Sequence, residues 1–191
     1  ETFKPAQVQI YNEFNHDRFN ATACGATADC YLPILRAAAD SIRSVAPDTL
    51  ILGGETALYE AEWFRTLWAV GGANYLDAAG FHPYETYGNP DSIGAVVQQA
   101  KLDMAETGAG DIPVWITEMG WTTKTGDVGD ATQANNLIKS AISTLASGGS
   151  KFFWYDLIDD SRDPADHEGN FGLFTQADRG VSTFAPKHSA F

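Results

Sequence analysis

Positive charge is scarce in this chain of 191 residues, which has 12 lysine and arginine residues against 25 aspartate and glutamate residues. A nucleic-acid partner would need a basic face for its phosphates, so a formal net charge of −13 argues against one. Long apolar runs are missing as well, because no run reaches the about 18 residues that a membrane-spanning helix requires. We therefore expect no nucleic acid and no membrane among the partners, and an acidic surface suited to neutral ligands.

Cysteine is rare too, with Cys24 and Cys30 placed together in a loop of small residues, NATACGATADC. A local disulfide in a secreted or extracytoplasmic protein is the favoured interpretation, and two free thiols are the alternative. No second pair of cysteine or histidine residues stands at ligand spacing, so we predict no metal centre, and no motif indicates a cofactor. The opening ETFKPAQ lacks the pattern of a signal peptide and is typical of a cut inside a longer protein.

Strand-like and helix-like segments alternate along the chain, with strand centres roughly every 30 to 40 residues. This alternation predicts an α/β fold with a parallel sheet in a single domain over residues 1–191. The expected strands are 8–15, 49–56, 77–85, 113–119 and 151–157. The expected helices are 31–45, 60–76, 92–107 and 131–147. We expect 158–191 to be loop-like, with a short helix starting at Pro186.

Polar and aromatic residues stand where the predicted strands end. Parallel sheets place their active sites at the carboxyl ends of the strands, so these residues are expected to meet at one edge. Glu118 in PVWITEMGW is the clearest example, because a carboxylate ends an apolar run and needs either a partner or access to solvent. The residues at strand ends are Asn12, Glu13, Glu55, His82, Tyr84, Glu118, Trp154 and Asp156.

Four of these strand ends together resemble a known group of enzymes. In order and spacing, YNEFN, GFHPY, WITEMGW and FFWYDL look like strands four, six, seven and eight of the retaining glycoside hydrolases of clan A. The closing stretch DDSRDPADHEGNFGLF is similar to the tail of members of families 39 and 5. The resemblance implies parallel (β/α) units of a TIM barrel, a partial barrel of about five strands that corresponds to the fourth to eighth strands.

The resemblance also implies roles for individual residues. Glu13 would be the acid/base and Glu118 the nucleophile, with the Tyr84 hydroxyl orienting Glu118. Asn12 would bind the sugar 2-hydroxyl, and Trp154 would form an apolar floor beneath the sugar ring. The implied substrate-binding residues, with a packing role as the alternative for His82, are Asn12, His82, Tyr84 and Trp154.

The expected function is that of a retaining glycoside hydrolase that cleaves β-linked glycosides or polysaccharides through two carboxylates. The alternative is a catalytically idle partial barrel that binds carbohydrate or assembles with itself or with a partner chain. A five-stranded remnant would leave unpaired edges on the strands at 8–15 and 151–157, and such edges invite pairing. We therefore expect a carbohydrate substrate. Three interpretations of the missing strands stay open: a fragment of a longer enzyme, a homodimer that pairs through these edges, and a complementing chain.

Other features of the sequence have plainer interpretations. Glu55 is expected to have a structural role, with a sugar contact as the alternative. The acidic stretch between residues 159 and 168 is interpreted as a solvated loop rather than a calcium site, because it lacks the spacing of a calcium-binding loop. Trp63 and Trp68 are expected to pack in the core.

Overall fold

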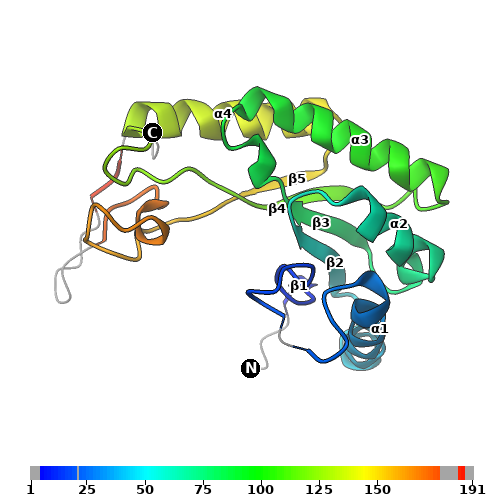
Figure 1. Cartoon of the computed structure of the whole chain (residues 1–191). Helices are drawn as coiled ribbons and strands as arrows, with labels where there is room; N and C mark the ends of the chain where they lie inside the picture. Colours follow the sequence, from blue (N-terminus) through cyan, green and yellow to red (C-terminus); the bar gives the residue numbers. More distant parts are fainter. Residues whose placement is uncertain (1–4, 21, 177–184, 188–191) are drawn as a thin grey trace.

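A computed structural model describes residues 5–20, 22–176 and 185–187, which form a curled half-barrel of five parallel strands with a helix between each pair of successive strands (Figure 1). The strands, in sheet order, are β1 (Gln7–Gln9), β2 (Leu50–Ala57), β3 (Ala78–His82), β4 (Val114–Met119) and β5 (Lys151–Trp154). The helices are α1 (Ala28–Val45), α2 (Ala61–Ala69), α3 (Ile93–Glu106) and α4 (Asp130–Ala146). The structure confirms the partial TIM barrel that the sequence predicts.

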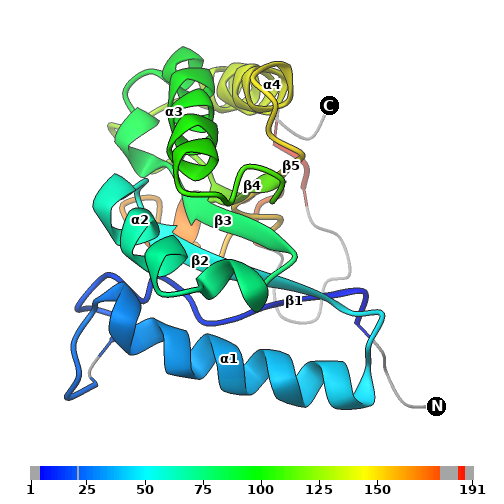
Figure 2. The same cartoon turned by 90° about the vertical axis from the view of Figure 1, so that its right-hand side faces the viewer.

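The four helices follow one another in an arc around the outer face of the sheet (Figures 1 and 2). They share one side because the crossover from a strand to the next parallel strand is almost always right-handed. Ile51, Phe81 and Ile116 point from successive strands into this layer and are fully buried. Trp63 and Trp68 of α2 are also buried there, as expected. This contact between sheet and helices forms the main core.

The inner face of the sheet holds a smaller apolar group of Leu52, Ala78 and Trp115. The Lys151 ammonium lies 3.9 Å above the Trp115 ring and donates a hydrogen bond of 3.1 Å to the Gln7 side chain, so it links β5 to β1. A closed TIM barrel fills this space with layers of side chains from all eight strands. In this chain no described helix or strand covers the face.

Three predicted strands end earlier than the sequence pattern indicates. β1 stops at Gln9, because Tyr11 and Glu13 have positive φ angles of 72° and 49°, which a strand cannot contain. β3 stops at His82, because Pro83 leads into the short 3₁₀ helix η2 (Tyr84–Thr86). β5 stops at Trp154. The polar residues expected at strand ends therefore lie in turns just beyond them, where side chains are free to converge.

The helical boundaries differ as well. α1 begins at Ala28 rather than residue 31, and α2 ends at Ala69 rather than residue 76, where Gly71 adopts a φ of 89° and η1 (Gly72–Asn74) follows. Beyond β5 the chain is largely irregular, with η4 (Glu168–Asn170) as its one described helix. Pro186 forms a β-bridge with Phe174, so it does not start a helix there. The rest of that expected helix lies outside the described residues.

Candidate active site

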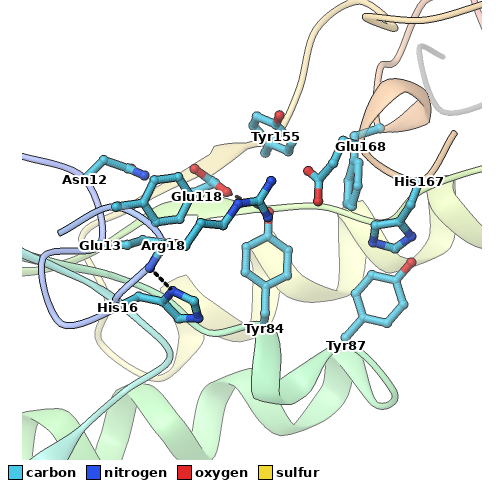
Figure 3. A pocket seen from close by; sticks show the side chains of 12 residues that line it. Asn12, Glu13, His16, Arg18, Tyr84, Tyr87, Glu118, Tyr155, His167 and Glu168 are labelled. Atoms are coloured by element: carbon cyan, nitrogen blue, oxygen red, sulfur yellow. Dashed lines mark hydrogen bonds between the residues drawn. The ribbon is translucent and has the colours of Figure 1, made fainter. Parts of the chain in front are cut away.

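A cleft of about 680 Å³ opens at the carboxyl ends of the strands, between the loop after β1 and the segment after β5 (Figure 3). Its walls carry three carboxylates, one arginine, two histidines and several aromatic rings. They are lined by Asn12, Glu13, His16, Arg18, Phe19, Tyr84, Tyr87, Glu118, Tyr155, His167, Glu168 and Phe171. The fold thus converts the predicted set of strand ends into a concave site.

The carboxylates of Glu13 and Glu118 meet in this cleft although 105 residues separate them along the chain (118 − 13). One oxygen of each, with one ring nitrogen of His82, all lie within 4.8 Å of one another. Both groups keep contact with solvent, since their side chains are 13% and 25% exposed respectively. At this distance the charge of Glu13 disfavours the ionisation of Glu118.

Glu13 is held by its own backbone. Its N–H donates a 2.7 Å hydrogen bond to the carbonyl of Glu55, and its carbonyl accepts a 2.9 Å bond from the N–H of His16. Its φ of 49° lies in the left-handed region, which turns the side chain away from the direction that a continuing strand would give it. The turn after β1 therefore aims this carboxylate into the cleft.

Glu118 is oriented by Tyr84, whose hydroxyl donates a 2.9 Å hydrogen bond to Oε1. Burial raises the pKa of Glu118, and the charges of Glu13 and Glu168 add to that effect. The charge of His82 and the tyrosine hydrogen bond oppose it. Burial also raises the pKa of Tyr84, with the charge of Glu118 as the next cause, so the tyrosine remains a hydrogen-bond donor. The Glu118 carboxylate is thus fixed by a hydrogen bond from Tyr84 and is only partly exposed to solvent.

His82 lies behind the carboxylate pair, with a side chain only 1% exposed. Its Nδ1 is 2.8 Å from Glu13 and 3.8 Å from Glu118, and its Nε2 is 3.7 Å from Glu55. Burial lowers the pKa of His82, but the contacts with Glu13 and Glu55 and the charge of Glu118 outweigh it, and the pKa rises to about 9. The imidazole is therefore positively charged near neutral pH and attracts the carboxylates of Glu13, Glu55 and Glu118.

Comparison with solved structures places this geometry in a known fold. A family 39 glycoside hydrolase from the gut symbiont Bacteroides cellulosilyticus WH2 matches 95% of the chain with a TM-score of 0.74 and 25% sequence identity. A monomeric β-xylosidase from Caulobacter crescentus CB15 matches 95% with a TM-score of 0.65 and 19% identity. The family 39 enzyme from Xanthomonas axonopodis pv. citri matches 87% with a TM-score of 0.64 and 18% identity.

The chain has the fold of family 39 glycoside hydrolases. It spans 38%, 39% and 36% of the lengths of these three proteins, so it corresponds to a part of their barrels. β-Galacturonidases of family 2 from Eisenbergiella tayi also match, with TM-scores of 0.61. No protein-family model matches the sequence, and no curated protein does.

The fold brings four of the six residues to which the resemblance gives roles into the cleft. Asn12, Glu13, Tyr84 and Glu118 line the cleft. His82 supports the cleft from behind, in the hydrogen-bonded position that was its alternative interpretation, and does not line it.

Trp154 is placed differently from its expected role as the floor of the cleft. Its ring stacks on Trp121 with centroids 5.9 Å apart, on the side of the helices, and does not line the cleft. Side chains alternate between the two faces of a strand, so the next residue, Tyr155, reaches the cleft instead. The apolar platform predicted for Trp154 is therefore available only from Tyr155 and the other aromatic residues of the wall.

Sequence reasoning missed the residues that the loops contribute. His16, Arg18 and Phe19 come from the turn after β1, and His167 and Glu168 come from the segment after β5. The sequence indicates only that both segments follow strands whose carboxyl ends form the site, and it does not indicate which of their residues line the cleft. Loop conformation then decides which of their residues face inward.

The acidic stretch between residues 159 and 168 is not a uniformly solvated loop. Asp159 is buried and paired with Lys187 at 2.6 Å, while Glu168 lines the cleft. Lys187 also donates a 2.8 Å hydrogen bond to the Thr123 hydroxyl. A charge pair buried this well fixes the end of the described chain against the segment after β5.

The structure forms the Cys24–Cys30 disulfide, with Cα atoms 5.7 Å apart, in the loop before α1. None of the helices in the described ranges is long and apolar enough to cross a membrane. Among the described residues, Glu13, His82 and Glu118 are the one group of three acids, histidines or cysteines with donor atoms close enough to share a metal ion. The absence of a metal and of a cofactor stays a prediction.

Proposed function

We propose that this chain carries the catalytic carboxylates of a retaining glycoside hydrolase that acts on β-linked glycosides or polysaccharides. The observation that carries the proposal is the approach of Glu13 and Glu118 to within 4.8 Å in an open cleft. Retaining enzymes hold their two carboxyl groups about 5–5.5 Å apart, whereas inverting enzymes need about 6.5–9.5 Å to admit a water molecule. The close approach of the two carboxylates favours retention.

In the proposed reaction Glu118 attacks the anomeric carbon and forms a covalent ester with the sugar. The glycosidic bond breaks at the same time, and its oxygen takes a proton from Glu13. Water then attacks the same carbon, Glu13 accepts a proton from it, and the bond between the sugar and Glu118 breaks. Glu13 is protonated again and Glu118 is again a carboxylate, so each turnover consumes one water molecule.

The surroundings of the two acids suit these steps. Tyr84 fixes one oxygen of Glu118 and leaves the carboxylate partly exposed to the cleft. Aromatic rings of Phe19, Tyr155 and Phe171 offer apolar surface to the C–H faces of a sugar. Asn12 lines the same cleft and is proposed to bind the sugar 2-hydroxyl.

One observation favours the second candidate function, an idle partial barrel that binds carbohydrate or pairs with another chain. None of the described helices or strands covers the inner face of the sheet, where Leu50 is 43% and Phe153 36% exposed. The matched glycosidases are more than twice as long as the chain, which spans 38% of the first of them. The remaining strands of a barrel, from a second copy or a complementing chain, would cover this face.

Covalent trapping separates the two functions. We expect incubation with 2-deoxy-2-fluoro glycosides to give one glycosyl adduct by intact mass spectrometry, located on Glu118. The variant Glu118→Gln should form none and should lose hydrolysis by about 10⁴-fold or more, because the nucleophile is gone. Its matched control is Glu106→Gln on the exposed end of α3, which should react like the parent. An adduct-free parent that still binds the sugar supports the idle barrel.

A further inference from the structure

Glu55 is a carboxylate with no part in the proposed reaction, and it lies directly beneath the site. It lies near the end of β2, at the bulge between Gly54 and Thr56, with a φ of 49°, and its side chain is fully buried. It does not line the cleft, so it does not contact a bound sugar there. This overturns the alternative interpretation of Glu55 as a sugar contact.

The space for this carboxylate is made by Gly80 in the neighbouring strand. A methyl group added at Gly80 would overlap Oε1 of Glu55, far inside van der Waals contact. The fold therefore keeps a glycine where an ordinary side chain would displace the acid. A buried carboxylate costs free energy unless its environment compensates, so a position built around one calls for an explanation.

The contacts of the Glu55 carboxylate are few and point toward the site. Among the described residues, Oε2 accepts a hydrogen bond from the Thr117 hydroxyl and lies 3.7 Å from Nε2 of His82, while Oε1 has no partner. The opposite nitrogen of the same ring lies 2.8 Å from Glu13. One imidazole thus connects the buried acid to the proposed acid/base.

This arrangement constrains both the orientation and the protonation of the ring. A negative charge on the Nε2 side favours a proton on Nε2, and the acids on the other side favour a proton on Nδ1. The charged and titratable groups that face the ring come from three elements: Glu13 in the turn after β1, Glu55 in β2 and Glu118 in β4. With both nitrogens protonated, Nδ1–H donates to Glu13.

We propose that Glu55 is a positioning residue, which holds the His82 ring so that Nδ1–H donates to Glu13 and fixes that carboxylate for its work as acid/base. The expected effect of Glu55 on turnover rests on the proposed glycosidase function. Its expected effect on the His82 ring does not. It acts through His82, so Glu55 itself needs no contact with the substrate.

Nuclear magnetic resonance of the His82 ring nitrogens tests the structural consequence without any activity. In the 191-residue parent, both nitrogens should carry protons at neutral pH. In Glu55→Gln, which keeps the shape of the side chain but removes its charge, the pKa of His82 should fall and the ring signals should shift. Glu13→Gln should also shift them, because the ring is held from both sides. Ring signals in Glu55→Gln identical to those of the parent would overturn the proposal.

Kinetics with a dinitrophenyl β-glycoside test the consequence for the reaction. This leaving group needs no acid, so turnover reports on the second step, in which Glu13 is the base. Glu55→Gln should slow turnover about ten-fold, the value of one charge-assisted hydrogen bond, and move its pH profile. Thr117→Val, which removes only the hydroxyl on Glu55, should give a smaller loss in the same direction.

A merely structural role makes a different prediction. The control is Asp103→Asn, which alters another buried acid that does not line the cleft and should leave the turnover and pH profile unchanged. An equal loss in Asp103→Asn and Glu55→Gln, without movement of the pH profile, contradicts a positioning role. If the parent forms no glycosyl adduct, the proposed function is contradicted instead. The measurement of the His82 ring nitrogens then tests the effect of Glu55 on His82 independently of activity.

Discussion

Two buried carboxylates in this molecule have opposite surroundings. Asp103 of α3, 1% exposed, accepts hydrogen bonds from Arg65 at 2.6 Å, from the Tyr59 hydroxyl at 2.6 Å and from Gln99 at 3.1 Å. Glu55, 0% exposed, has one hydroxyl donor and a histidine at 3.7 Å. Asp103 has three side-chain donors and Glu55 has one, although neither carboxylate is exposed at the surface.

The pKa values respond to this difference. Burial raises the pKa of Asp103, but its hydrogen bonds and the charge of Arg65 outweigh burial and lower the pKa overall. Burial also raises the pKa of Glu55, and there the contacts with His82 and Thr117 do not overcome it. Asp103 thus has enough donors to favour its charged form, whereas Glu55 does not.

The largest expected effect is a pH dependence of the free energy of unfolding, which should differ between the groups around Glu55 and those around Asp103. His82 has a raised pKa of about 9, so its stabilisation is fully present below about 6.5 and is lost as the pH rises through about 9. This loss should be of the order of 3 kcal/mol in the free energy of unfolding, measured with urea between about pH 6 and pH 9.5. In His82→Asn the curve should be flatter over this range.

Asp103 should respond on the acid side. Because the pKa of Asp103 is lowered in the folded state, this acid stabilises the fold at any pH above its ordinary pKa. That stabilisation is lost as the pH falls through the lowered pKa. In Asp103→Asn we expect the free energy of unfolding to fall by about 2 kcal/mol at neutral pH, because a buried network loses its charge. Urea unfolding measures the change, and a stability equal to that of the parent would contradict a structural role for this acid.

The smallest expected effect has the opposite sign. Glu55→Gln should raise the free energy of unfolding by about 1 kcal/mol near pH 8, because an under-supplied buried charge is removed. The gain should shrink as the pH falls, since burial raises the pKa of Glu55 and the acid takes up a proton in the folded state. A loss of stability as large as that of Asp103→Asn would make the two acids alike.

Much of the fold was predictable because it depends on local patterns. The alternation of apolar strands and amphipathic helices predicts the parallel half-barrel. The positions of Glu13, Tyr84 and Glu118 after apolar runs predict that they meet at the carboxyl ends of the strands, where they line the cleft. Trp154 failed as the floor of the cleft because an error of one residue in a strand reverses the direction of a side chain. The sequence places Glu55 at a strand end and Asp103 in a helix, but it does not show that both are buried or which donors each has, since burial and partners depend on contacts between distant segments.

The order of strands and helices, the acidic charge and the presence of two glutamates at the ends of strands can be read from the amino-acid sequence. Those properties follow from residue type and spacing, which act within a few residues. Tertiary contacts are needed to bring Glu13 and Glu118 within 4.8 Å of each other, to connect them to Glu55 through His82 and to turn Tyr155 toward the cleft. These depend on the curl of the sheet and on the turns after each strand, which bring together residues far apart in the chain.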